Sequence, residues 1–326
     1  MPSAAPILST DLAGLPLRSP VILAAGTAGT LDEMSDVVDL SRVGAVVTKS
    51  ITRQPRYGNE TWRVLPVDAG MLNAIGLANV GLDAFVQEYA PRAAQVPTTV
   101  IASIAGYSVE DYVQCAAALD GVEGIPAVEL NVSCPNVHWG CEFASDVGLL
   151  TELIRAVRPV LTRTRLFVKL SPIAAGRPSI VEIAKAAIDP GGAAAGPNGR
   201  AGADALCISN TIPAMAIDVE TRKPRLANVT GGLSGPALHP VAVKLVYDVY
   251  RGIARDTKTP IVGIGGVLKW EHAAEFILAG ATAVEVGTGL FADPRTPIKV
   301  ADGMAKWARR QGASRVSSLV GGLETE

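Results

Sequence analysis

The amino-acid sequence predicts an α/β fold built from repeated strand–helix units. Short apolar runs alternate with segments of helical periodicity through most of the chain, which is the pattern of a parallel sheet. Eight such runs follow a segment near Ile7–Leu17 that suits a short hairpin, and no G-x-G-x-x-G follows the first of them. Eight units favour a TIM (β/α)8 barrel over an open doubly wound sheet. We therefore expect residues 1–326 to form one barrel domain with a short N-terminal hairpin and long loops at its C-terminal face.

The eight predicted strands are short and apolar, and the segments between several of them place apolar residues on one helical face. In Val109–Leu119, for example, Tyr112, Val113 and Ala116 can share a face. The predicted strands are Val21–Ala25, Ala45–Thr48, Thr99–Ile104, Ala127–Asn131, Leu166–Leu170, Ala205–Ile208, Pro260–Gly263 and Ala283–Val286. The predicted helices are Val109–Leu119, Val147–Leu161, Ser179–Ala187, Ala237–Gly252, Trp270–Ala279 and Pro297–Arg310.

Three connections are longer than ordinary loops. Those at Lys49–Asp83 and Asn210–Gly235 follow strands, so they belong to the C-terminal rim, where barrel loops shape active sites. The third, Asp189–Gly202, is rich in Gly, Ala and Pro and precedes a strand. We expect it to be a tolerated surface insertion on the opposite, N-terminal rim.

Composition excludes several classes of function. The chain has 29 basic and 31 acidic residues and a net charge of −2, which gives no general attraction to nucleic acid or to an anionic membrane. No apolar run approaches the ~18 residues of a membrane span, and no secretory signal is evident. The four cysteines show no C-x-x-C spacing, so no metal site is expected, and a reducing cytoplasm is the simplest location.

The stretch Val128–Asn136 is the most unusual part of the chain. An apolar run ends in Asn131, Ser133, Cys134 and Pro135, and strands are depleted of Asn. A thiol that follows a strand by three residues, among polar groups and before a proline, suits a reactive role better than a core position. By contrast, Cys115 and Cys207 lie in apolar helical and strand patterns and are expected to be buried, and no motif assigns chemistry to Cys141.

Lys49 and Lys169 both lie at predicted strand ends. A lone lysine there is commonly a solvated charge, but two at one barrel mouth favour function. Either one forms a Schiff base, as in an aldolase, or both provide positive charge to an anionic cofactor and substrate.

Glycine clusters at Gly231–Gly235, Gly263–Gly266 and Gly287–Gly289 suit phosphate binding, because the last two directly follow the final two strands. The histidines show no ligand spacing. Only His138 lies in the Cys134 loop, where it could touch a substrate, tune the thiol or remain on the surface.

Several motifs resemble the class 1 dihydroorotate dehydrogenases. They are Glu-Leu-Asn-Val-Ser-Cys-Pro-Asn-Val at 129–137 and Asn-Ala-Ile-Gly-Leu at 73–77. The segment Met215–Pro224, followed by Thr230–Ala237, is similar to class 1B, the type that passes electrons to NAD through a partner. The resemblance extends from Leu8 through the last helices.

The resemblance implies an FMN-dependent oxidation of (S)-dihydroorotate to orotate in de novo pyrimidine (UMP) biosynthesis. Cys134 would be the base that removes the C5 proton while hydride leaves C6 for flavin N5. The implied substrate-binding residues are Lys49, Asn73, Ala74, Ile75, Gly76, Leu77, Asn131, Asn210 and Thr211. The implied FMN-binding residues are Ala25, Gly26, Lys49, Ser50, Ser103, Asn131, Lys169, Ser209, Gly235, Gly265, Gly266, Gly287 and Thr288.

The chain departs from the family pattern at three of its positions. Ser103 replaces a usual Asn, Ser209 replaces a usual aliphatic residue, and Cys141 replaces a frequent Gly. The resemblance also implies a homodimeric core with a partner subunit that carries FAD and a 2Fe–2S cluster, because this chain has no motif for either group.

Other functions remain open at this stage. A fumarate-linked class 1A enzyme and another flavoprotein acting on pyrimidine rings are the near alternatives. A Schiff-base aldolase using Lys169 and a barrel retained as a non-catalytic scaffold are more remote.

Overall fold

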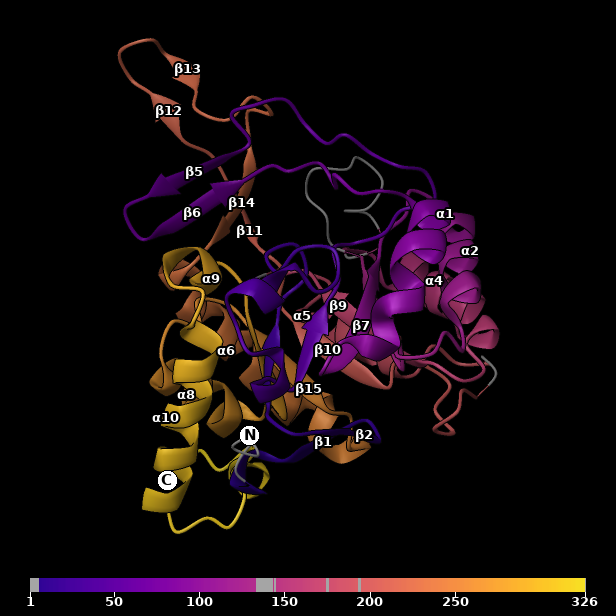
Figure 1. The fold of residues 1–326 in the computed structure, drawn as a ribbon, viewed down its shortest axis with the longest axis vertical. Coiled ribbons are helices and arrows are strands. Elements are labelled where there is room, and N and C mark those ends of the chain that lie inside the picture. The colour runs from indigo at the N-terminus through magenta and orange to yellow at the C-terminus, as the bar shows by residue number, and fades with distance from the viewer. Residues whose placement is uncertain (1–5, 133–142, 144, 174–175, 193–194, 326) are drawn as a thin grey trace.

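A closed parallel barrel organises the chain. The computed structural model describes residues 6–132, 143, 145–173, 176–192 and 195–325. Eight strands pair in the order β10-β15-β16-β3-β4-β7-β8-β9, which confirms the predicted TIM barrel (Figure 1). The strands are β3 (Val21–Leu23), β4 (Ala45–Val47), β7 (Thr99–Ile104), β8 (Ala127–Asn131), β9 (Arg165–Leu170), β10 (Ala205–Ile208), β15 (Ile261–Ile264) and β16 (Ala283–Val286).

Helices cover the outside of the barrel, and three of the longer ones begin at a side-chain cap. The Ser108 hydroxyl accepts a hydrogen bond from the Asp111 N–H, and Ser179 and Glu182 form a capping box. The longer helices are α2 (Val109–Leu119), α4 (Val147–Val157), α5 (Ile180–Ile188), α6 (His239–Val249), α8 (Trp270–Ala279) and α10 (Thr296–Arg310). Short helical turns fill the remaining connections: η1 (Pro6–Leu8), η2 (Glu33–Asp36), η3 (Leu40–Arg42), α1 (Leu82–Ala84), η4 (Phe85–Tyr89), η5 (Ala90–Gln95), α7 (Arg255–Thr257), α9 (Gly289–Ala292) and η9 (Val316–Leu319).

Two predicted helices have different ends in the structure. The helix predicted to reach Leu161 stops at Val157 and continues as the 3-10 turn η6 (Arg158–Val160), because Pro159 lacks the N–H that an α-helix needs. The helix predicted from Ala237 to Gly252 is divided into the turn η7 (Pro236–Leu238), α6 and the π-helical turn η8 (Tyr250–Ala254).

The predicted N-terminal hairpin closes the lower end of the barrel. Its strands β1 (Thr10–Leu12) and β2 (Leu15–Leu17) are antiparallel, and Leu12, Leu15 and Leu17 pack against interior residues such as Phe167. Both chain ends lie toward this end (Figure 1). The interior is therefore a filled core rather than a channel.

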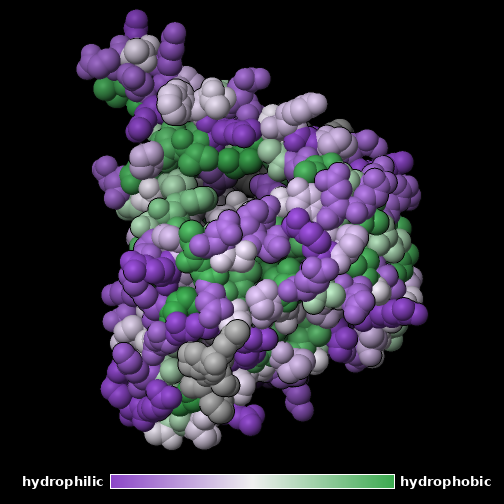
Figure 2. Space-filling model, viewed as in Figure 1, coloured by the Kyte–Doolittle hydropathy of each residue, from purple (hydrophilic) through white to green (hydrophobic). Residues whose placement is uncertain are grey.

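The two long connections at the C-terminal ends of the barrel strands, residues 49–83 and 210–235, form a second sheet above the barrel (Figure 1). Its strands are β5 (Val64–Val67), β6 (Gly70–Asn73), β11 (Ile212–Ala214) and β14 (Gly231–Ser234), in the order β11-β14-β6-β5. A ribbon of β12 (Ile217–Asp218) and β13 (Lys223–Pro224) projects beyond it. Figure 2 shows hydrophobic side chains gathered at this end of the molecule, beside a hollow.

The 189–202 connection lies on the N-terminal rim, as predicted. The Asn198 amide donates a hydrogen bond to the Ala13 carbonyl oxygen in the hairpin at 2.8 Å. Gly196 lies so close to Arg158 that an added Cβ would be 2.2 Å from its guanidinium carbon. Among the residues that the structure describes, no helix has the length and apolar character of a membrane span.

Candidate active site

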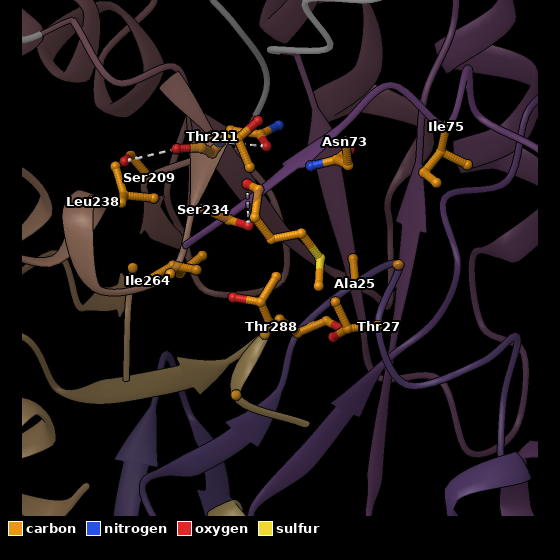
Figure 3. Close-up of a pocket in the computed structure, with 18 of the residues that line it drawn as sticks. Ala25, Thr27, Asn73, Ile75, Ser209, Thr211, Ser234, Leu238, Ile264 and Thr288 are labelled. Atoms are coloured by element: carbon orange, nitrogen blue, oxygen red, sulfur yellow. Dashed lines mark hydrogen bonds between the residues drawn. The ribbon is translucent and has the colours of Figure 1, made fainter. Parts of the chain in front are cut away.

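A pocket lies between the C-terminal ends of the barrel strands and the upper sheet. Figure 3 shows Asn73 and Ile75 across the cavity from Ser234, Leu238 and Ile264, with Ala25 and Thr288 beside it. The structure thus brings together side chains from both long connections and from the barrel. The sequence-predicted residues that line it are Ala25, Gly26, Lys49, Ser50, Asn73, Ile75, Gly76, Leu77, Asn131, Lys169, Ser209, Asn210, Thr211, Gly235, Gly265, Gly266, Gly287 and Thr288.

Two predicted site residues do not line the pocket. Ala74 is fully buried and packs with Leu72 on the opposite face of β6 from Asn73, because side chains alternate along a strand. Ser103 is fully buried, and its hydroxyl lies 3.0 Å from that of Ser50, so it supports the lining from behind. The predicted base Cys134 lies outside the described residues, as do His138 and Cys141.

Hydrogen bonds orient the amides of the pocket. The Asn131 amide nitrogen donates to the Ser50 hydroxyl at 3.2 Å, and its oxygen accepts from the Asn210 amide at 3.2 Å. The Asn210 oxygen in turn accepts from the Thr211 N–H at 2.8 Å. From the upper sheet, the Asn73 amide donates to the Gly232 carbonyl oxygen at 3.3 Å. Preoriented amides suit a planar ring that presents both donors and acceptors.

Lys169 forms part of the pocket floor and is paired with two buried carboxylates. Its Nζ lies 3.2 Å from Glu285 Oε2 and 3.7 Å from Glu129 Oε1. Burial alone would lower the pKa of Lys169, but the two carboxylates outweigh it and raise the pKa above its usual value. The side chain therefore stays a cation. A Schiff-base aldolase needs the neutral amine, so this environment disfavours that alternative.

The glycine loop after β15 has a backbone conformation that residues with a side chain rarely adopt. Gly265 and Gly266 have φ values of 147° and 62°, and a Cβ on Gly266 would be 2.6 Å from the Gly235 carbonyl oxygen. His239 Nδ1 donates to the Gly265 carbonyl oxygen at 2.8 Å. His239, the first residue of α6, thus supports a pocket loop without lining the pocket itself.

Sequence patterns missed a group of lining residues that the fold brings in from the upper sheet and the barrel rim. Met71 and Ser234 are hydrogen-bonded across the upper sheet, with the Ser234 hydroxyl 3.3 Å from the Met71 carbonyl oxygen. Met71 carries no sequence signal beyond its place in a long connection, whereas Ser234 lies in the predicted Gly231–Gly235 cluster. The lining residues outside the predicted glycine clusters and predicted site are Ala24, Thr27, Val64, Met71, Leu238, Val267 and Phe291, while Ser234, Ile264 and Gly289 lie within those clusters.

The two cysteines that the structure describes are core residues, as predicted. Both are free and buried. Burial raises the pKa of Cys115 to about 12 and raises that of Cys207 well above its ordinary value. Neither thiol is therefore available as a thiolate.

The pocket's chemistry fits an anionic cofactor with a planar polar ring. Lys49 and Lys169 supply positive charge, Asn and Ser groups supply hydrogen bonds, and the Gly265–Gly266 turn leaves backbone accessible. Residues of this chain therefore fit FMN. Fold and pocket together define a TIM-barrel enzyme with a site for such a cofactor beside a small substrate.

Comparisons with known proteins identify the family. The dihydroorotate dehydrogenase family model matches residues 7–307. Proteins named dihydroorotate dehydrogenase B (NAD(+)), catalytic subunit, from Trichlorobacter lovleyi and Pelobacter propionicus are 46% and 44% identical to this chain; each match covers 98% of this chain and 99% of the relative. The chain belongs to the dihydroorotate dehydrogenase family of oxidoreductases. The structure of DHODH from Eimeria tenella in complex with ferulenol shares the fold, with a TM-score of 0.82 and 22% identity over 98% of this chain and 89% of that one.

Proposed function

We propose that this chain oxidises (S)-dihydroorotate to orotate with bound FMN. The observation that carries the proposal is the pocket itself, in which two lysines and three amides meet between the barrel mouth and the upper sheet. The names of the full-length relatives support the same substrate.

Bound FMN would supply the hydride acceptor for C6 of dihydroorotate. The chain's residues hold and orient the reactants. Asn73, Asn131 and Asn210 bind the carboxylate and amide groups of the pyrimidine, and Lys49 adds positive charge. Lys169 supplies charge to a cofactor that becomes anionic on reduction.

The test is purification of the chain without added cofactor. We expect a yellow protein whose flavin absorbance bleaches when dihydroorotate is added anaerobically. A colourless protein that cannot be reconstituted with FMN, or a flavin that dihydroorotate does not bleach, would overturn the proposal.

Cys134 is proposed as the base that takes the C5 proton. Cys134→Ala should lower turnover by about 10²–10⁴-fold, the usual contribution of a positioned base, while FMN stays bound. Cys141→Ala, in the same segment, serves as the matched control and should retain turnover. Equal activity of the two variants would exclude Cys134 as the base.

Electron transfer to NAD is proposed to require a partner subunit that carries FAD and a 2Fe–2S cluster on a homodimeric core. The relatives' names describe a catalytic subunit, which supports a separate partner. The isolated chain should reduce an artificial acceptor much faster than NAD. Comparable rates would contradict this part, and rapid oxidation by fumarate would support the class 1A alternative.

A further inference from the structure

Three ionisable side chains form a buried cluster inside the barrel, directly below the pocket. Glu129 is on β8, Lys169 on β9 and Glu285 on β16, and each is at most 6% exposed. Of the three, only Lys169 also lines the pocket. The two carboxylates can therefore affect the pocket through their contact with Lys169. The proposed function gives them no role.

The cluster holds more negative than positive charge unless it keeps a proton. Oxygen atoms of Glu129 and Glu285 and the Cys207 sulfur lie within 4.8 Å of one another, a grouping that could otherwise suggest a metal site. The Lys169 ammonium, 3.7 Å and 3.2 Å from the two carboxylates, is the cation that this grouping holds. One ammonium balances one carboxylate, so the second carboxyl is favoured in its protonated form.

Among the residues that line the pocket in the described part of the chain, the one further charged side chain is that of Lys49. Interior side chains of β3, β4, β7 and β15 include the apolar Ile22, Val47, Ile101, Val262 and Ile264, and β7 adds the neutral Ser103, which pairs in register with Glu129. Cys207 on β10 stays a thiol, because burial raises its pKa. Burial also raises the pKa of Glu285 to about 8, with Lys169 opposing the shift and Glu129 adding to it.

We infer that Glu129 and Glu285 are positioning residues that hold the Lys169 ammonium at the pocket floor and, through one shared proton, set the reduction potential of the bound flavin. The inference rests on the proposed binding of FMN. With the proton in place the cluster is neutral, and when the proton leaves it carries one negative charge. Negative charge below the pocket disfavours a cofactor that becomes anionic on reduction.

The test measures the reduction potential of bound FMN between pH 6.5 and 9.5 in the wild type, Glu129→Gln and Glu285→Gln. At pH 6.5 Glu285→Gln should match the wild type, because Gln resembles the protonated acid. At pH 9.5 its potential should be higher than that of the wild type, by about 30 mV for a tenfold change in the preference for reduced over oxidised flavin. Glu129→Gln should behave in the same way, matching the wild type at pH 6.5 and exceeding it at pH 9.5, because the remaining Glu285 carboxylate then balances the Lys169 ammonium.

Glu152→Gln is the matched control, since it makes the same change on an exposed position of α4. Its potential should follow that of the wild type at every pH. If Glu129→Gln does not fold, Glu285→Gln still decides the question. Potentials of the Glu285→Gln variant equal to wild type at both pH values, with only a changed melting temperature, would show a purely structural role and overturn the inference. A protein that never binds FMN would instead refute the proposed function.

Discussion

Asn131 connects the pocket to the core behind it. Its amide joins Ser50 to Asn210, while Ser103 holds Ser50 from outside the pocket. Asn131→Ala removes a direct contact to the ligand and one hydrogen bond each from Ser50 and Asn210, at a cost of about 0.5–1.5 kcal/mol per hydrogen bond. We expect kcat/KM for dihydroorotate to fall about 10- to 100-fold, measured by steady-state kinetics with an artificial acceptor.

Ser103→Ala is the control for that prediction. It removes a hydrogen bond one residue further from the cavity, so the loss should stay below about fivefold. Equal losses in both variants would mean that Ser103 contacts a ligand directly, as the family resemblance implies.

The polar residues that line the site can be predicted from the sequence more readily than the buried residues that contact them and set their charge. Asn131 and Lys169 are conspicuous because they end apolar strands. Glu129 and Glu285 occupy positions within buried strands, where a charged residue is unusual and indicates a paired or functional group. That they face Lys169 depends on barrel register, which no local pattern contains.

At the scale of elements, the barrel strands were predictable and the upper sheet was not. Strands such as β7 and β8 are buried on both faces, so they appear as continuous apolar runs. Strands β6 and β14 are short, contain glycine and pair across a separation of about 160 residues. Nothing local specifies that pairing, so the sequence could show only that the two connections were long.

The turn after β15 should tolerate no side chain at Gly266. Gly266→Ala must accept both a left-handed φ and a Cβ 2.6 Å from the Gly235 carbonyl oxygen, so the pocket loop has to shift. We expect the purified variant to contain less than half the flavin of the wild type, measured by absorbance after denaturation. Gly312→Ala is the control for backbone strain alone. Gly312 has a φ of 67°, but nothing lies within 4 Å of an added Cβ, so this variant has the left-handed strain without the steric clash. If both variants keep full flavin content, the Gly266 turn does not shape the cofactor site.

Asp120 links the end of α2 to the start of β9. Its carboxylate accepts hydrogen bonds from the Thr162 hydroxyl and from the N–H groups of Arg163 and Thr164. Burial opposes ionisation, but these hydrogen bonds outweigh it and lower the pKa of Asp120 to about 2. Because the folded-state pKa is below the unfolded one, the stabilisation is present above pH ~4 and is lost as pH falls toward 2.

Asp120→Asn should therefore reduce the free energy of unfolding by about 1 kcal/mol at pH 6, a value discounted for the solvent that screens this partly exposed carboxylate, and by less at pH 2.5. Urea unfolding followed across that range measures the difference. The exposed Asp256→Asn is the control, and it should change the free energy of unfolding by less than about 1 kcal/mol. A difference for Asp120→Asn that stays constant with pH would contradict the linkage.

The whole molecule separates stability from chemistry along the barrel axis. The pocket occupies the C-terminal end, whereas the hairpin, the 189–202 connection and a buried ion pair occupy the other. In that pair Arg158 Nη1 lies 2.9 Å from Asp204 Oδ2, and both side chains are 0% exposed. Asp204 also accepts from the Leu166 N–H at 2.8 Å, which ties the start of β9 to the segment before β10.

Asp204→Ala tests this separation, because it leaves the Arg158 cation buried without its carboxylate. Removing one partner of such a pair costs about 3–5 kcal/mol, so the free energy of unfolding should fall by that amount in a denaturant titration. Asp32→Asn is the matched control, since it breaks an exposed pair with Arg92 worth at most about 1 kcal/mol. Below the unfolding transition, kcat per bound flavin should equal that of the wild type for both variants. A loss of kcat in folded Asp204→Ala would mean that the N-terminal end is coupled to the pocket through the strands, and that the two ends of the barrel do not act independently.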